Sequence, residues 1–137
     1  MANLVTNEVV FQGDKQKVQD ILRDIQMDAE GPGSLDFNKV IPRPPSLNID
    51  CGTQTINGLK AYRAYIGELA KKPSQDADAA QQLKEQYREK YGQDTFDLGE
   101  KAYINLQLYG HATWYEWSNA CWGTKWNAYE FSGCAER

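Results

Sequence analysis

The C-terminal part of the chain carries the densest group of side chains that could bind a ligand. Residues 114–131 contain all four tryptophans of the protein, with two tyrosines and one phenylalanine. Aromatic rings stack on flat ligands, and a neighbouring cation adds attraction for anionic ones. The residues that could form such a surface are Trp117, Trp122, Lys125, Trp126 and Tyr129. The same rings could instead fill a hydrophobic core, and the spacing leaves both interpretations open.

A second candidate surface is acidic. Asp20, Asp24 and Asp28 recur at intervals of four residues, so a continuous helix would align them in one row. Glu30 lies just beyond this row. The four carboxylates could contact a basic channel of another protein that normally holds nucleic acid, or they could be an ordinary solvated face. A metal site is not expected, because side chains on one exposed face do not converge on an ion.

The residues typical of catalysis are sparse. His111 is the sole histidine, and Cys51, Cys121 and Cys134 form no CxxC pair. We favour buried or incidental thiols for the three cysteines. A zinc site would have to gather them and His111 from scattered positions, and a disulfide between Cys121 and Cys134 is a further alternative. The phosphate-binding patterns GxGxxG and GxxxxGK followed by Ser or Thr do not occur. We therefore predict no catalytic residue, no metal, no cofactor and no enzymatic activity.

Length and composition set limits on the function. A chain of 137 residues with 41% hydrophobic and 12% aromatic residues is typical of one folded globular domain. Its net charge of -4 argues against direct electrostatic binding of nucleic acid. No apolar run is long enough to span a membrane, and the N-terminus lacks signal-peptide features. We expect a cytoplasmic protein without membrane contact.

The hydrophobic pattern predicts both strands and helices. Alternating, β-branched or aromatic residues favour strands, and these lie at residues 3–12, 34–41 and 126–131. Asp14 is a good N-cap for a helix whose apolar stripe runs to Ile25.

Further helices are expected in the middle of the chain. Their apolar stripes cover residues 59–69, 79–91 and 96–109, the last ending at Gly110. Thr113 with Glu116 three residues later predicts a capping box that opens one more short helix.

Four segments resemble one known family. They are the N-terminal MAN…V…GD, residues 36–44 (DFNKVIPRP), residues 58–62 (GLKAY) and residues 122–129 (WGTKWNAY). In sequence and order they resemble the YubB-type ferredoxin-like domain proteins, which phages, prophages and plasmids carry and which have no established activity. The resemblance implies a single α+β, ferredoxin-like domain over residues 1–137 with a helical insertion at about 46–121. It implies no catalytic residue. Because the tryptophan-rich segment would join the insertion to the sheet, the resemblance also favours Trp114, Trp117 and Trp126 as core and hinge residues.

The chain departs from this family at its C-terminal end. Family members usually continue with a further helix and strand that complete the sheet, whereas this chain ends at Arg137. An uncovered sheet edge would pair with a second copy, giving a homodimer, or with another partner by strand addition. An edge covered by loops or by the insertion would not pair.

Two hypotheses of function follow. The first is a non-enzymatic phage or mobile-element protein that inhibits a bacterial defence nuclease, such as a CRISPR effector, through protein contact. This anti-CRISPR-like role would use Asp20, Asp24, Asp28 and Glu30. The second is a module that binds a small ligand, nucleotide or carbohydrate through the tryptophan-rich segment.

Overall fold

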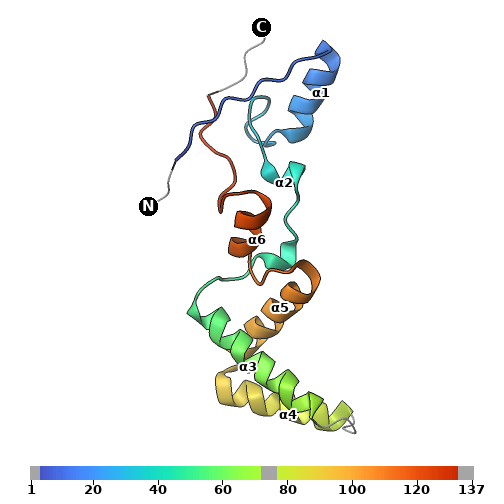
Figure 1. Ribbon diagram of the computed structural model, residues 1–137, viewed down its shortest axis with the longest axis vertical. Helices are drawn as coiled ribbons and strands as arrows, with labels where there is room; N and C mark the ends of the chain where they lie inside the picture. The colour runs from blue at the N-terminus through green and yellow to red at the C-terminus, as the bar shows by residue number, and fades with distance from the viewer. Residues whose placement is uncertain (1–3, 72–76, 133–137) are drawn as a thin grey trace. The chain divides into compact units, whose positions relative to one another are not determined.

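The computed structural model describes residues 4–71 and 77–132, and the chain divides into two compact units. Unit 1 is Met1–Pro42 with Asn127–Arg137, and unit 2 is Arg43–Trp126. Unit 1 contains α1 (Lys15–Ile25) and α2 (Phe37–Val40), as labelled in Figure 1. The helices of unit 2 are η1 (Pro45–Leu47), α3 (Thr53–Ala70), α4 (Ala77–Tyr91), α5 (Gln93–Tyr109) and α6 (Trp114–Cys121).

The predicted α+β, ferredoxin-like fold is wrong, because the part of the chain that the structure describes is helical and contains no β-strand. Residues 4–12 and 126–131 have no regular secondary structure, and residues 37–40 of the second predicted strand form α2. Residue 3 lies outside the described residues. A β-prone segment becomes a strand only when a neighbouring strand pairs with its backbone, and no such neighbour lies among the described residues. The sheet edge expected to form a dimer is likewise absent from them.

Hydrogen bonds from side chains to the backbone organise the start of α1 and the turn that follows it. The Asp14 carboxylate accepts the backbone N–H of Lys17 at 3.2 Å, so the predicted N-cap is confirmed. After α1, the Ser34 hydroxyl donates to the Gly31 carbonyl at 2.6 Å and accepts the Met27 N–H at 2.8 Å. No residue of α1 is buried. Local caps and turns therefore organise this segment without a hydrophobic core.

A capping carboxylate explains why a helix replaces the second predicted strand. Asp36 Oδ1 accepts the backbone N–H of Asn38 and the side-chain amide of Asn127, each at 2.9 Å. Asn127 Oδ1 in turn accepts the N–H of Phe37 at 2.9 Å. These bonds satisfy the first free N–H groups of α2 and favour a helical turn over an extended chain.

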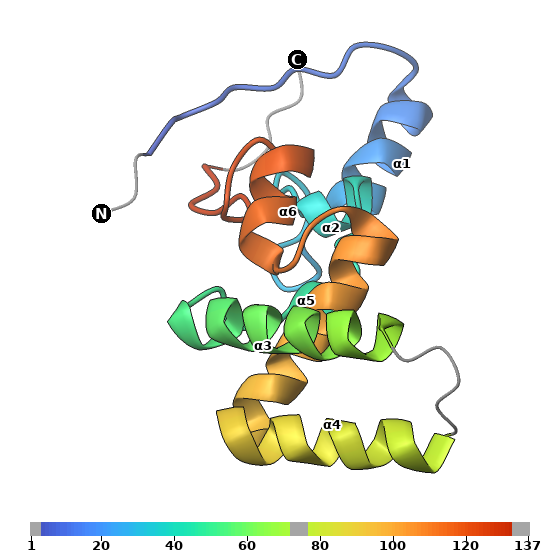
Figure 2. The same cartoon turned by 60° about the horizontal axis from the view of Figure 1, so that its bottom comes forward.

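Unit 2 is built on a close crossing of two helices. Helices α3 and α4 run antiparallel, and α5 crosses them (Figure 2). At the crossing Gly58 faces Gly99 so closely that a Cβ on Gly58 would overlap the Thr95 carbonyl oxygen. A Cβ on Gly99 would overlap the Gly58 carbonyl oxygen. Glycine at both positions lets the two backbones touch.

Aromatic rings fill the space beside this crossing. Phe96 is fully buried, and the rings of Tyr62, Tyr65 and Tyr87 surround it at centroid distances of 5.5, 5.6 and 6.4 Å. The Tyr87 hydroxyl donates to Glu68 Oε2 at 2.6 Å, and this hydrogen bond is the main cause that raises the pKa of Tyr87 to about 12. Edge-to-face contacts of this kind stabilise a core beyond the area that they bury.

A buried asparagine joins α5 to the segments on either side of it. Asn105 Oδ1 accepts the Ser46 hydroxyl, while its Nδ2 donates to the carbonyls of Ser46 and Ala112, all at 2.9 Å. α5 ends at Gly110, whose φ of 74° is in the left-handed region, so the predicted stop is confirmed. The Asn105 bonds hold η1 and the loop before α6 against α5, and this arrangement supports the candidate site.

Candidate functional site

Four indoles and two cations of unit 2 form a continuous series of ring contacts, which we call the cation–indole stack. In order, its members are Lys125, Trp126, Trp114, Arg43, Trp122 and Trp117. Lys125 Nζ lies 5.5 Å from the ring centroid of Trp126. Trp126 stacks on Trp114, with centroids 5.3 Å apart and planes inclined by 29°. This offset stacking is a favourable geometry for two aromatic rings.

The guanidinium of Arg43 connects the two halves of the stack. Its central carbon lies 5.9 Å from the Trp114 ring and 5.2 Å from the Trp122 ring. Its Nη1 donates to the hydroxyl of Ser118, a fully buried residue, at 3.1 Å. Trp122 then meets Trp117 edge to face at 5.4 Å. A planar guanidinium suits this position because it attracts two ring faces while it donates a hydrogen bond.

Local sequence signals position the elements that carry these rings. The capping box is confirmed, since the Thr113 hydroxyl caps α6 and the Glu116 side chain accepts the Thr113 backbone N–H. Trp114 and Ser118 are four residues apart and so share a face of α6. Arg43 lies between two prolines, which favour an extended backbone and present its side chain from a stiff segment.

The stack runs from the core to the surface. Trp117 is only 6% exposed, Trp114 and Trp122 are half-buried, and Trp126 is 49% exposed. The two interpretations of the aromatic segment therefore apply to different residues. Trp117 belongs to the core, and Trp126 presents an indole to solvent.

Lys125 is the cation beside Trp126 in unit 2. Among the described residues of unit 2, no carboxylate lies within 4.0 Å of the Lys125 ammonium. The one acidic residue of α6, Glu116, is engaged by the Thr113 cap.

The structure brings together most of the predicted ligand residues and adds two. Trp117, Trp122, Lys125 and Trp126 all belong to the stack. Tyr129 is 49% exposed but lies in unit 1. Arg43 and Trp114 were missed as site residues. The only sequence signal for Arg43 was a cation between prolines, because its contact with α6 joins segments that are distant in the chain.

The acidic residues do not form the predicted single row. α1 ends at Ile25, so Asp28 and Glu30 lie in the turn that follows it. Each aspartate has a cation of unit 1 nearby. Asp20 lies 2.9 Å from Arg23 Nη2, Asp24 lies 3.9 Å from Arg23 Nε, and Asp28 lies 2.5 Å from Lys39 Nζ. These contacts offset part of the negative charge that a basic partner would meet.

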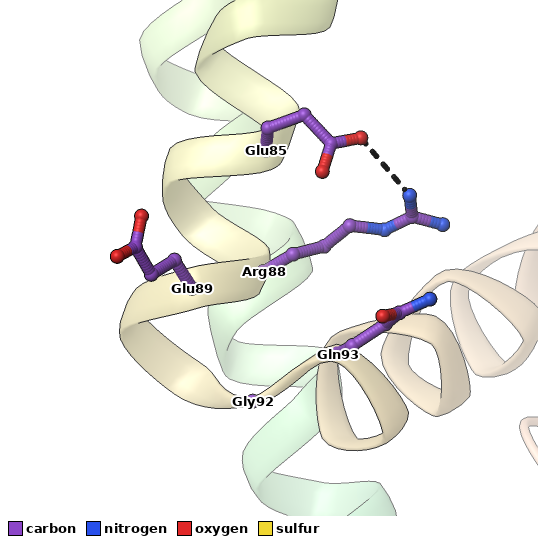
Figure 3. A pocket seen from close by; sticks show the side chains of 5 residues that line it. All are labelled: Glu85, Arg88, Glu89, Gly92 and Gln93. Atoms are coloured by element: carbon purple, nitrogen blue, oxygen red, sulfur yellow. Dashed lines mark hydrogen bonds and ion pairs between the residues drawn. The ribbon is translucent and has the colours of Figure 1, made fainter.

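A hollow of about 440 Å³ lies where α4 meets α5 (Figure 3). It is lined by Glu85, Arg88, Glu89, Gly92 and Gln93. Arg88 donates to Glu85 at 3.1 Å and to Asp97 at 3.0 Å, and the bond to Asp97 is the main cause that raises its pKa. A guanidinium already held by two carboxylates is a poor anion site, so we assign this hollow no binding role.

The other side chains considered for chemistry do not converge. Cys51 and Cys121 are free and exposed, and Cys134, with the alternative disulfide, lies outside the described residues. Within the described ranges, no three His, Cys, Asp or Glu side chains gather as a metal site would require. None of the described helices has the length and apolar character needed to cross a membrane.

The comparisons with known proteins identify no relative. No family model, no curated protein and no solved structure matches the chain. The resemblance to the YubB-type family stays a prediction, and the geometry of the cation–indole stack is the basis for the function proposed below.

Proposed function

We propose that this chain is a non-enzymatic binding protein that stacks a flat face of a small ligand on Trp126. The observation that carries the proposal is an indole 49% exposed at the end of an ordered series of rings. Trp114 and Arg43 hold this end in place before any ligand arrives. Preorganisation of this kind reduces the entropy lost on binding.

A ligand would compete with Lys125 for the Trp126 ring, and the magnitudes favour the ligand. An exposed cation–π contact is worth about 0.5–1 kcal/mol. Stacking of one base on an aromatic side chain is worth about 1–3 kcal/mol. The flexible lysine can move aside and keep its charge near the ligand, so stacking replaces the weaker contact.

Tryptophan fluorescence tests this proposal with two flat probes, adenosine and cellotriose. We expect at least one of them to quench the fluorescence of the wild-type protein in a saturable way and to have no such effect on Trp126→Ala. Tyr109→Ala removes another exposed aromatic residue of unit 2 and should keep the response. The proposal fails if neither probe quenches, or if Trp126→Ala responds like the wild type.

A second candidate function is favoured by the distribution of charge between the units. Unit 1 contains nine acidic and five basic side chains, whereas unit 2 contains ten of each, so the whole net charge of -4 belongs to unit 1. An acidic unit could occupy a basic channel in a bacterial defence nuclease, such as a CRISPR effector. The cytoplasm would be the compartment of such an inhibitor.

This second candidate is tested by titrating a reconstituted CRISPR effector with the protein. Changing Asp20, Asp24 and Asp28 to Asn should weaken binding at least about tenfold, and added salt should do the same. The matched control changes three carboxylates of unit 2, Asp78, Glu89 and Asp94, to their amides. Equal losses in both triple variants, or no binding by the wild type, would contradict a role of the acidic face.

A further inference from the structure

We infer that the ligand of the cation–indole stack is a nucleoside monophosphate whose base stacks on Trp126 and whose phosphate meets Lys125. The inference rests on the proposed function and selects one ligand class from those that stacking alone would admit. Two observations lead to it: the exposed ring and the position of the ammonium over that ring.

The position of Lys125 favours an anion attached to the stacked ring. Its ammonium lies over the ring, 5.5 Å from the Trp126 centroid, so a base that takes its place on the indole leaves the lysine beside the stacked ligand. A phosphate is a stronger acceptor for an ammonium than a neutral hydroxyl, because the hydrogen bond is then assisted by charge on both sides. A neutral sugar would use the indole and leave this charge unused.

The charge of unit 2 favours a single phosphate over a polynucleotide. Arg43 is held between two indoles and by Ser118, so Lys125 is the stack cation placed to meet a ligand. With ten acidic and ten basic residues, unit 2 carries no net charge. Proteins that bind single strands combine stacking with a basic track along the backbone, and a neutral unit does not supply that attraction.

The test compares AMP, adenosine, cellotriose and a single-stranded oligodeoxyadenylate by fluorescence titration at low salt. We expect AMP to bind about five- to tenfold more tightly than adenosine, because one charge-assisted contact contributes about 1 kcal/mol or more. Lys125→Gln should reduce the affinity for AMP to that for adenosine. Lys125→Arg should preserve the preference for AMP, and the exposed Lys101→Gln should leave it unchanged.

The possible results distinguish the inference about the phosphate from the proposed stacking function. Equal binding of AMP and adenosine, or tighter binding of cellotriose, would overturn the inference and leave the stacking function intact. An oligonucleotide affinity far above that of AMP, after correction for the number of bases, would overturn the assignment of a single phosphate. Absence of any response would overturn both the inference and the proposed function.

Discussion

The two units of this protein are ordered by different kinds of interaction. Among the described residues, every buried apolar side chain lies in unit 2, whereas the one buried side chain of unit 1 is Ser34. Unit 1 depends on caps and turns, such as those made by Asp14 and Asp36. Unit 2 adds a close helix crossing and a cluster of aromatic rings. The two units thus differ more in how many side chains they bury than in helix content.

Charge separates them as well. The ion pair between Arg88 and Asp97 in unit 2 joins two partly buried side chains at 2.9 Å. In unit 1 the Asp28 side chain, which pairs with Lys39, is 86% exposed. Exposed pairs are screened by solvent and contribute little, so the hydrogen-bonded turns of unit 1 matter more than its ion pairs. The following substitutions test this comparison, from the largest expected effect to the smallest.

The largest difference in stability is expected between alanine substitutions of two phenylalanines, one in each unit. Phe96→Ala removes a ring that is fully buried in unit 2 and should lower the free energy of unfolding by about 3–5 kcal/mol. Phe11→Ala removes a ring of unit 1 that is 39% exposed and should cost less than about 1 kcal/mol. Urea unfolding followed by circular dichroism measures both. Similar losses for the two variants would contradict the placement of the core in unit 2 alone.

The helix crossing should be nearly as sensitive. Gly99→Ala places a methyl group against the Gly58 carbonyl and should cost about 3 kcal/mol, because backbone cannot rotate aside as a side chain can. Gly67→Ala on α3 is the control, since its Cβ would meet no atom within 4 Å. The control should stabilise the helix by about 0.5–1 kcal/mol. Thermal unfolding of both variants distinguishes a packing effect from a general intolerance of alanine.

High pH should weaken unit 2 through Tyr87. Its pKa of about 12 exceeds the value of 10.0 expected when unfolded, so the stabilising contribution is complete below pH 10 and is lost as the pH rises towards 12. Tyr87→Phe should therefore flatten the decline of the urea midpoint above pH 10. Tyr109→Phe, an exposed tyrosine of α5, serves as the control. If both variants decline as steeply as the wild type, the hydrogen bond to Glu68 does not contribute.

The smallest effect is expected at the exposed ion pair of unit 1. Replacing Asp28 by Asn should cost at most about 1 kcal/mol at low salt. In about 1 M salt the cost should nearly vanish, because the Debye length falls to about 3 Å. A double-mutant cycle with Lys39→Gln isolates the coupling energy. A coupling of several kcal/mol that persists in salt would show that this pair is as important to unit 1 as the core is to unit 2.

Local signals in the sequence predicted helix caps and stops well and strands poorly. The Asp14 cap, the Gly110 stop and the Thr113–Glu116 capping box are confirmed because each depends on atoms a few residues apart. The strand at residues 34–41 is wrong because its alternating pattern ignored the Asp36 side chain, which caps α2. Residues 4–12 are β-prone, but a strand also needs a partner, and no local pattern supplies one.

The candidate site shows the same difference between features set by neighbouring residues and features set by distant ones. Sequence alone identified the aromatic segment and the lysine within it, because those residues are neighbours in the chain. It could not assign Trp117 to the core and Trp126 to the surface, since burial depends on what packs against each ring. Nor could it place Arg43 between Trp114 and Trp122, a contact that requires the fold of unit 2. The sequence by itself therefore determined the capping hydrogen bonds, because their donors and acceptors are a few residues apart. The exposure of each indole and the position of Arg43 were decided by the tertiary structure, because they depend on packing between segments that are distant in the chain.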